Sequence, residues 1–406
     1  RASLLTGQYS QSTGVYTVLT DNGFKAFDDR RTLGTSLNAA GYNTLFIGKY
    51  LNGYGAQKSK VTGKGSFRYV PPGWTDWYGS VDRPAGSSYA SGGTYNYYHA
   101  IFNHNGTIDD THKGQYQSGV EGRLASTLIR KYHRSAKPFF LYFAPIAPHF
   151  GAPTENGDPT HVVWPNTGKH ESMKTPARPR SVRGIFDKQI LRASGMPKNG
   201  GPSEQSVRDK HRPLRYLPEL SPQEKLAVRD VTRQRAETLY ALDKQVKRLV
   251  NTLKATGEDK NTVIMFTSDN GYFLGEHRLR QGKILTNEPS LRVPFLICGP
   301  GIPHGTRYDP ITTEDVTATI LRFAGAKPPH PSDGAVVVAS FKADQGWKLP
   351  VITEGTTWDT TARRAASHHP ALFKDGRSTI GIRTAGWKYL RYHNGDGELH
   401  NLTHDP

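Results

Sequence analysis

The sequence predicts an α/β fold in which helices flank a large mixed, mostly parallel sheet, with a small antiparallel sheet at the C-terminus. Short continuous apolar runs alternate with segments of helical periodicity, a pattern typical of strands buried on both faces of a parallel sheet. The final segment changes to alternating runs around Ala385-Gly386, followed by a turn at 394–397, which predicts antiparallel hairpins. The predicted buried strands are TLFIG (44–48), KPFFLYFA (137–144), NTVIMFTS (261–268) and VPFLICG (293–299).

Two helices are predicted, one before the first of these strands and one before the third. LGTSLNAAGY places Leu33 and Leu37 four residues apart, and Gly41 stands where a helix would end. A longer helical pattern covers about residues 221–255, and Gly257 follows as a stop. Its apolar stripe consists of Leu239, Leu242, Val246, Leu249, Val250 and Leu253.

The chain is predicted to divide into two parts. Residues 1–345 form a main domain, and residues 346–406 form a smaller subdomain that holds the antiparallel sheet. Within the main domain, about residues 150–220 are rich in Pro, Gly, Lys and Arg and are predicted to form a long surface insertion. A loop of this length in a compact domain usually has a function.

Composition narrows the range of partners. The 53 basic and 35 acidic residues give a formal charge of +18, which favours anionic partners. Zinc-finger spacing, RNA-binding aromatic motifs and dense basic blocks are not found, so nucleic acid is not expected. No apolar run approaches the roughly 20 residues of a membrane span, so no transmembrane segment is expected. The one cysteine, Cys298, lies in PFLICG and is expected to be a buried core thiol.

Polar residues follow several of the predicted strands. Asp269 and Asn270 come directly after NTVIMFTS, where open α/β sheets bind ligands, and they offer oxygen ligands for Ca²⁺ or Mg²⁺. Turn formation alone would also explain them, because Asp, Asn and Gly are favoured in turns. His149 follows KPFFLYFA in APHFGAP and could donate to a ligand oxygen or move a proton; a solvated loop histidine is the alternative.

Three further cations are expected at the same rim: Arg1, Lys49 directly after TLFIG, and Lys283 in RLRQGKILTNEPSLRVP. Taken singly, each lysine is more often a solvated charge. Several cations together with a metal would form a site for a compact oxyanion whose charge grows in the transition state. Hydrolysis of a sulfate or phosphate ester is therefore the predicted chemistry.

Ordered motifs along the whole chain resemble the sulfatase family. RASLLTG resembles the end of the sulfatase signature, and the later motifs follow in the order that sulfatases show. Within the family, the chain is most similar to the branch of N-acetylglucosamine-6-sulfatases and heparan-sulfate endosulfatases. The motifs that carry the resemblance are TLGTSLNAAGYNTLFIGKY, GKYLNGYG, PPGWTDWYG, YNYY, APHFGAP, TSDNGYFLGEH, GK ahead of LRVPFLICGPG, and ELHNLTHDP.

The resemblance implies an alkaline-phosphatase-like sandwich and one divalent cation, usually Ca²⁺, with Mg²⁺ or Mn²⁺ as alternatives. It implies a formylglycine nucleophile, made from a Cys or Ser four residues before Arg1 and so outside this sequence. A further Asp pair of the metal site is expected upstream as well. Cys298 lacks the signature and is excluded as the nucleophile. The implied substrate is a sulfated saccharide, and the implied location is exported: secreted, periplasmic or lysosomal-like.

The resemblance also assigns roles to the candidate residues. Arg1 would steady the formylglycine, Lys49 and Lys283 would hold sulfate oxygens, and His149 would bind the ester oxygen or protonate the leaving alkoxide. Asp269 and Asn270 would supply two metal ligands. The family's common GKWHLG motif is altered here, because Leu51 replaces the histidine, and Asn52 is the expected substitute contact. His277, in GEHR, is a weaker candidate for substrate binding.

Two other functions remain open at this stage. A phosphoester or phosphonate hydrolase of the same superfamily would share the metal ligands. A catalytically inactive homologue that binds polyanions would share the charge. The sequence does not determine the sulfate position, endo or exo action, or the oligomeric state.

Overall fold

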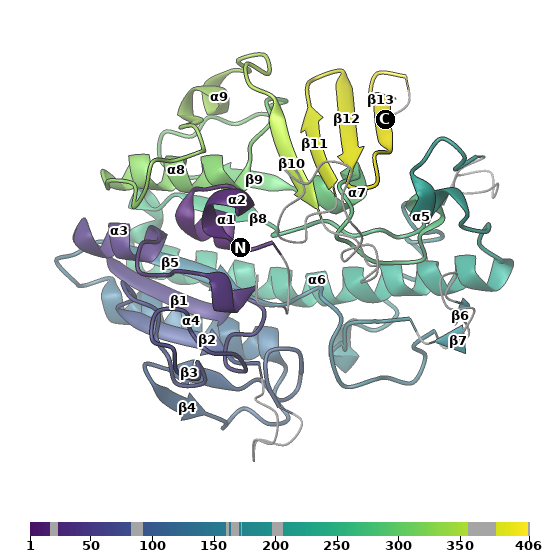
Figure 1. The fold of residues 1–406 in the computed structure, drawn as a ribbon. Helices are drawn as coiled ribbons and strands as arrows, with labels where there is room; N and C mark the ends of the chain where they lie inside the picture. Colours follow the sequence, from purple (N-terminus) through teal and green to yellow (C-terminus); the bar gives the residue numbers. More distant parts are fainter. Residues whose placement is uncertain are drawn as a thin grey trace.

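The computed structural model describes residues 1–16, 23–82, 92–159, 162–163, 170–171, 173–196, 206–355 and 379–404. A mixed five-stranded sheet with the order β4-β3-β2-β1-β5 is its largest sheet (Figure 1). β1 is parallel to both β2 and β5, whereas β3 and β4 continue the sheet in antiparallel fashion. The strands are β1 (Asn43–Lys49), β2 (Asp76–Ser80), β3 (Phe102–His104), β4 (Thr107–Asp109) and β5 (Phe139–Ala144).

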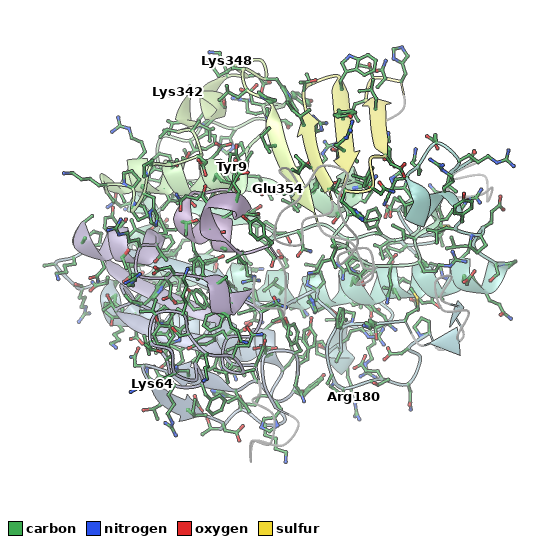
Figure 2. All side chains as sticks on the ribbon, in the orientation of Figure 1. Tyr9, Lys64, Arg180, Lys342, Lys348 and Glu354 are labelled. Atoms are coloured by element: carbon green, nitrogen blue, oxygen red, sulfur yellow. The ribbon has the colours of Figure 1, made fainter. Side chains whose placement is uncertain are left out.

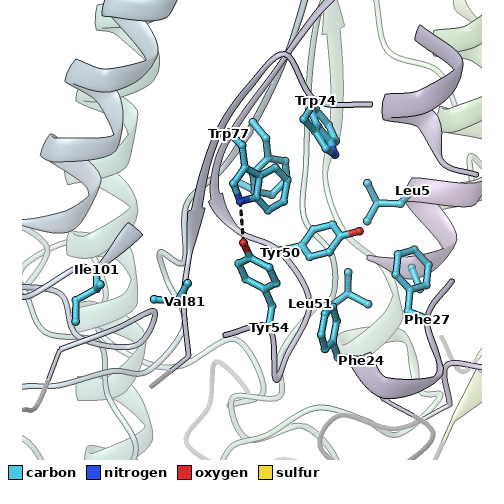
Figure 3. Close-up of a cluster of buried hydrophobic side chains, with 13 residues drawn as sticks. Leu5, Phe24, Phe27, Tyr50, Leu51, Tyr54, Trp74, Trp77, Val81 and Ile101 are labelled. Carbon is cyan, nitrogen blue, oxygen red and sulfur yellow. Dashed lines mark hydrogen bonds between the residues drawn. The ribbon is translucent and has the colours of Figure 1, made fainter. Parts of the chain in front are cut away.

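An aromatic core packs on one face of this sheet (Figure 3). Phe46 of β1 stacks on Trp77 of β2 with ring centroids 4.3 Å apart, and the Trp77 indole nitrogen donates to the Tyr54 hydroxyl at 2.8 Å. Tyr50 and Tyr54 follow β1 directly and are almost completely buried. The segment after β1 is therefore held by the core.

Helices cover both faces of the sheet, as the sequence predicted. On the aromatic side lies α1 (Ala2–Thr6), and α3 (Leu33–Ala39) packs on α8 (Thr313–Ala324). On the opposite side, Leu45 and Ile47 contact α4 (Gln117–Tyr132), which packs along α6 (Pro222–Thr256). α6 begins at a capping box and ends at Gly257, whose φ of 78° is the left-handed conformation that glycine favours. The short helices are α2 (Ser10–Thr13), α5 (Arg212–Arg215), α7 (Glu288–Leu291) and α9 (Val338–Lys342).

Two of the predicted buried parallel strands are paired differently. β8 (Ile264–Thr267) and β9 (Phe295–Cys298) form their own antiparallel pair. Each strand is half-exposed, with Leu296 58% exposed, because within the described residues they pair only with each other. Cys298 is exposed, so the prediction of a buried core thiol was wrong. An apolar run identified the strands but not their partners.

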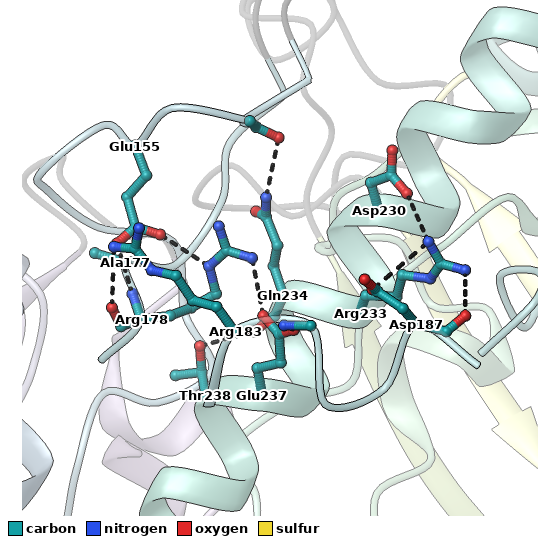
Figure 4. A network of polar contacts seen from close by, with 12 residues as sticks. Glu155, Ala177, Arg178, Arg183, Asp187, Asp230, Arg233, Gln234, Glu237 and Thr238 are labelled. Carbon is teal, nitrogen blue, oxygen red and sulfur yellow. Dashed lines mark hydrogen bonds and ion pairs between the residues drawn. The ribbon is translucent and has the colours of Figure 1, made fainter. Parts of the chain in front are cut away.

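The predicted surface insertion is more buried than expected. Met173, Ala193 and Met196 pack against the N-terminal half of α6, and two two-residue strands, β6 (Val162–Val163) and β7 (His170–Glu171), pair in this region. Arg178 bridges Glu155 and Glu237, both at 2.8 Å (Figure 4). The 35-residue helix α6 carries a buried face along this half, and the insertion covers it. The predicted stripe of α6 is partly wrong for the same reason: Leu239 is 40% exposed, whereas Glu237 is buried.

The C-terminal antiparallel sheet is confirmed. Its order is β10-β11-β12-β13, with β11 (Thr379–Arg383), β12 (Trp387–Tyr392) and β13 (Gly397–Asn401) at the predicted places. β10 (Val351–Gly355) was not predicted. The domain boundary near residue 345 stays a prediction.

Exposed basic side chains occur on several parts of the molecule. Figure 2 shows exposed side chains of Lys64, Arg180 and Lys342 on separate parts of the molecule. In the part of the chain that the structure describes, none of the helices is both long and apolar enough to cross a membrane.

Candidate active site

The strand ends of β1 and β5 are brought close together by a glycine. Gly48 has a φ of 105°, and a Cβ at this position would lie 2.3 Å from the backbone oxygen of Ala144. Lys49 ends β1, and residues 145–150, which we call the His149 loop, follow β5. The close approach therefore places Lys49 and the His149 loop at the same edge of the sheet, as the sequence predicted.

Arg1 joins this edge to the loop after β8. Its Nη1 donates to the backbone oxygen of Lys49 at 2.6 Å, and its Nε pairs with Asp269 Oδ2 at 2.7 Å. Asp269 lies in residues 268–271, which we call the SDNG loop. Burial by itself would raise the pKa of Asp269, but the charges of Arg1, Lys283 and Lys49 outweigh it and hold that pKa far below its usual range. Asp269 is therefore a carboxylate.

Lys49 is a buried cation, with 5% of its surface exposed. Its Nζ lies 4.9 Å from the ring centroid of Tyr95, in a cation–π contact. Burial lowers the pKa of Lys49 to about 7, together with the positive charges of Arg1 and Lys283. An anion bound next to Lys49 would stabilise its charged form.

Tyr95 connects three of the predicted residues, although the sequence analysis gave it no role. Its hydroxyl accepts a hydrogen bond from Asn52 Nδ2 at 2.9 Å, its ring carries the contact with Lys49, and its centroid lies 5.0 Å from that of His149. Asn52 is thus placed beside the site. The YNYY motif was the available signal, but a row of tyrosines does not indicate which ring faces a lysine.

His149 is held by its backbone and by one ring nitrogen. The Tyr97 hydroxyl donates to the backbone oxygen of His149 at 2.7 Å. The His149 Nδ1 lies 2.7 Å from the carbonyl oxygen of Phe150. A carbonyl only accepts, so Nδ1 carries the proton of the neutral ring and Nε2 is left for other contacts. Burial, together with the positive charges of Lys283 and Lys49, lowers the pKa of His149 to about 3.

The SDNG loop meets Lys283. The Lys283 Nζ donates to Asn270 Oδ1 at 2.8 Å, and the amide of Gly271 donates to the backbone oxygen of Ser290 at 2.8 Å. Between Gly271 and Lys283 the chain folds back on itself, and the amide of Phe273 donates to the backbone oxygen of Gly282. Burial lowers the pKa of Lys283. The charge of Asp269 raises this pKa, and the charge of Arg1 lowers it.

The predicted metal-ligand set is partial. Asp269 and Asn270 are adjacent and supply two hard oxygens, and each of these oxygens already contacts a positively charged group, Arg1 or Lys283. Carboxylate and amide oxygens are ligands that Ca²⁺ prefers, so the donor chemistry fits a divalent cation, which would compete with Arg1 and Lys283 for these oxygens. Ca²⁺ takes about six to eight oxygens, and within the described residues no group of three His, Cys, Asp or Glu side chains could hold a metal ion.

His277 occupies a different position from the other candidates. It lies in the 3₁₀ turn Glu276–Arg278 with a φ of 51°, and its ring packs edge-to-face against Phe273 with centroids 6.2 Å apart. This ring contact does not connect His277 to Arg1, Lys49 or Lys283. Its role in substrate binding stays a prediction.

Comparison with known proteins decides the family. The family model described as Sulfatase matches residues 1–326. The chain belongs to the sulfatase family. An arylsulfatase of Volvox carteri is 31% identical over 341 residues, which are 80% of this chain and 48% of the relative. The N-acetylglucosamine-6-sulfatase of Homo sapiens is 28% identical over 337 residues, 80% of this chain and 52% of the relative.

Other relatives of this sulfatase chain include a putative extracellular sulfatase Sulf-1 homolog of Caenorhabditis elegans. It is 27% identical over 344 residues, 82% of this chain and 41% of the relative. The chain thus spans about half the length of the curated relatives it matches.

Solved structures confirm the fold. A protein in complex with its substrate D-glucosamine-2-N,6-O-disulfate superposes with a TM-score of 0.66 at 20% identity, covering 100% of this chain and 81% of that one. A phosphonate monoester hydrolase from Silicibacter pomeroyi has a TM-score of 0.59 at 16% identity, covering 99% and 79%. The predicted fold class is therefore confirmed, and the fold by itself is shared by sulfate and phosphonate hydrolases.

Proposed function

We propose that the protein hydrolyses sulfate esters of sulfated sugars, of the amino-sugar 6-sulfate type. The observation that carries the proposal is the cluster of Arg1, Lys49, Lys283 and His149 around Asp269 and Asn270. Asp269 interacts with the positive charges of Arg1, Lys49 and Lys283, and Asp82 also lies near Lys49, so three cations face two carboxyl groups and the cluster keeps an excess of positive charge. That excess suits an ester that brings its own negative charge. A relative named N-acetylglucosamine-6-sulfatase supports the amino-sugar class.

The sulfatase family uses a formylglycine and a divalent metal ion. When bound, these supply the nucleophile and a Lewis acid for the sulfate group. We propose Ca²⁺ as the ion, with Mg²⁺ or Mn²⁺ as alternatives, and Asp269 and Asn270 as two of its ligands. Arg1 would hold the nucleophile end of the site through its position between Asp269 and the Lys49 backbone.

Lys49, Lys283 and His149 are the residues proposed to act on the ester. Lys49 and Lys283 would donate to sulfate oxygens, which stabilises charge that develops as the S–O bond breaks. Both roles expected of His149 require a proton on Nε2, yet the free ring is neutral with its proton on Nδ1. An anionic ester beside the ring would raise the pKa of His149. His149 would therefore gain its second proton together with the substrate and pass it to the leaving alkoxide.

Export is the proposed location. Relatives in Caenorhabditis elegans and Drosophila melanogaster are named as extracellular sulfatases. A sulfated glycan outside the cell would also match the net charge of +18.

The test is sulfate release by the full-length protein. Glucosamine 6-sulfate and the matching 6-phosphate are offered at equal concentration, and intact mass shows whether the expected Cys or Ser has become formylglycine. We expect sulfate release to exceed phosphate release, to fall on chelation and to return with added Ca²⁺. A preference for the phosphate ester would favour the phosphoester hydrolase instead. Binding of the glycan without hydrolysis of either ester would favour the inactive homologue.

A further inference from the structure

Arg235 of α6 contacts the His149 loop and the residue that follows the SDNG loop, although no motif pointed to it. Its Nη1 donates to the backbone oxygen of Pro148, the residue before His149, at 2.9 Å. Its guanidinium carbon lies 4.0 Å from the ring centroid of Tyr272, which directly follows the SDNG loop. One side chain thus contacts the His149 loop by a hydrogen bond and the end of the SDNG loop by stacking.

No sheet hydrogen bond joins these two loops in the described part of the chain. The His149 loop follows β5, which belongs to the five-stranded sheet and pairs with β1. The SDNG loop follows β8, which pairs with β9 in a separate sheet. Contacts outside the two sheets therefore help to set the distance between the loops, and Arg235 makes such contacts on both sides.

The charge of Arg235 is not explained by an ion pair. Its neighbours on α6 pair with acids: Arg229 with Asp230 at 2.8 Å, and Arg233 with Asp230 at 3.5 Å. The contacts recorded for Arg235 among the described residues are the Pro148 carbonyl and the Tyr272 ring. A half-buried guanidinium without a carboxylate partner costs free energy, so stabilisation of the helix does not account for it.

We propose that Arg235 is a positioning residue that fixes the His149 loop relative to the SDNG loop. The guanidinium group is suited to this role because it is planar, stacks on aromatic rings and donates in a fixed direction. A lysine would keep the charge but would lose the stacked, planar geometry. The proposal rests on the proposed sulfatase activity for its kinetic test, and on the loop contacts alone for its structural test.

The kinetic test compares Arg235→Met and Arg235→Lys with a control two residues away. Arg233 also donates to backbone oxygens, those of Ile190 at 2.8 Å and Asp187 at 2.6 Å, but on the insertion (Figure 4). In the full-length protein we expect Arg235→Met to lower kcat about 100-fold with KM nearly unchanged, as expected for misplaced catalytic groups. Arg235→Lys should recover little of this loss, and Arg233→Met should keep the parent kcat.

Amide hydrogen exchange tests the same proposal without turnover. Arg235→Met should speed exchange in both 146–151 and 269–273, whereas Arg233→Met should speed it in 184–192. Unchanged exchange in both loops would overturn the proposal, as would full activity of Arg235→Lys, which would show that only the charge matters. An inactive parent protein would instead contradict the proposed function, and the exchange result would still decide the role of Arg235.

Discussion

The two halves of the site are supported in different ways. The half after β1 rests on a buried strand whose residues Leu45, Phe46 and Ile47 are completely buried between aromatic rings and helix α4. The half after β8 rests on a half-exposed strand that, among the described residues, pairs with β9 alone. Its functional loop is held by polar and charged contacts: Arg1 to Asp269, Lys283 to Asn270, and Arg235 to Tyr272.

This difference separates stability from catalysis. Apolar packing holds the first half, and its loss should lower the free energy of unfolding. Charged groups hold the second half, and one of them, Lys283, is also proposed to bind the ester. Substitutions there should lower activity more than stability.

The largest effect is expected in the aromatic core. Trp77→Ala removes a fully buried indole that stacks on Phe46, and should lower the free energy of unfolding by about 3–5 kcal/mol. Denaturant unfolding measures the loss. Leu296→Ala, at a position 58% exposed on β9, is the control and should cost far less. Equal losses in the two variants would contradict the difference between the halves.

Removing a cation from the second half should affect mainly turnover. Lys283→Met leaves Asn270 without its donor and takes away one proposed contact to sulfate, so kcat should fall about 100- to 1000-fold. The thermal midpoint, measured on the same sample, should change little. A large drop in that midpoint with a normal kcat per folded molecule would show that Lys283 is structural.

Lys49 should set the alkaline limit of activity. An ammonium is charged below its pKa, so the cation is lost as the pH rises through about 7. In the free enzyme, kcat/KM should then fall about tenfold for each further pH unit. Lys49→Arg keeps its charge and should move this limb to higher pH, whatever its absolute rate. An unchanged limb in the variant would assign the titration to another group.

The smallest effect is expected at Tyr95. Tyr95→Phe keeps the ring beneath Lys49 but removes the acceptor for Asn52, which should cost about 1 kcal/mol, or roughly fivefold in kcat/KM. Tyr95→Leu also removes the cation–π contact and should cost more. Equal losses of kcat/KM in the two variants would show that the Tyr95 ring does not stabilise the Lys49 cation.

The sequence predicted individual elements better than their pairing. β1 and β5 were predicted as strands and are adjacent in the main sheet, because each apolar run has one strand's length and faces core on both sides of a parallel sheet. β8 and β9 were found by the same rule, but their antiparallel pairing and the exposure of Cys298 were not. A local apolar run indicates that a segment forms a strand. The partner of that strand depends on segments far away in the chain.

The candidate site was predicted in the same partial way. Arg1, Lys49, Asp269 and Lys283 stand at ends of predicted strands or in ordered motifs, and the structure brings them together. Arg235 could not be found, because it lies in the middle of a charged helix among other arginines. Only the tertiary structure shows which of those side chains reaches the site and has no acidic partner in the described part of the chain.

The sequence by itself determined the family, the α/β class and the C-terminal hairpins, and it predicted the main polar groups of the candidate site. These depend on local periodicity and on short motifs that can be identified one at a time. The tertiary structure decided which strands pair, how the insertion covers α6, and how Tyr95 and Arg235 join the site. Those features arise from contacts between residues up to hundreds of positions apart, and their free energies depend on burial and on distance, which no short segment contains.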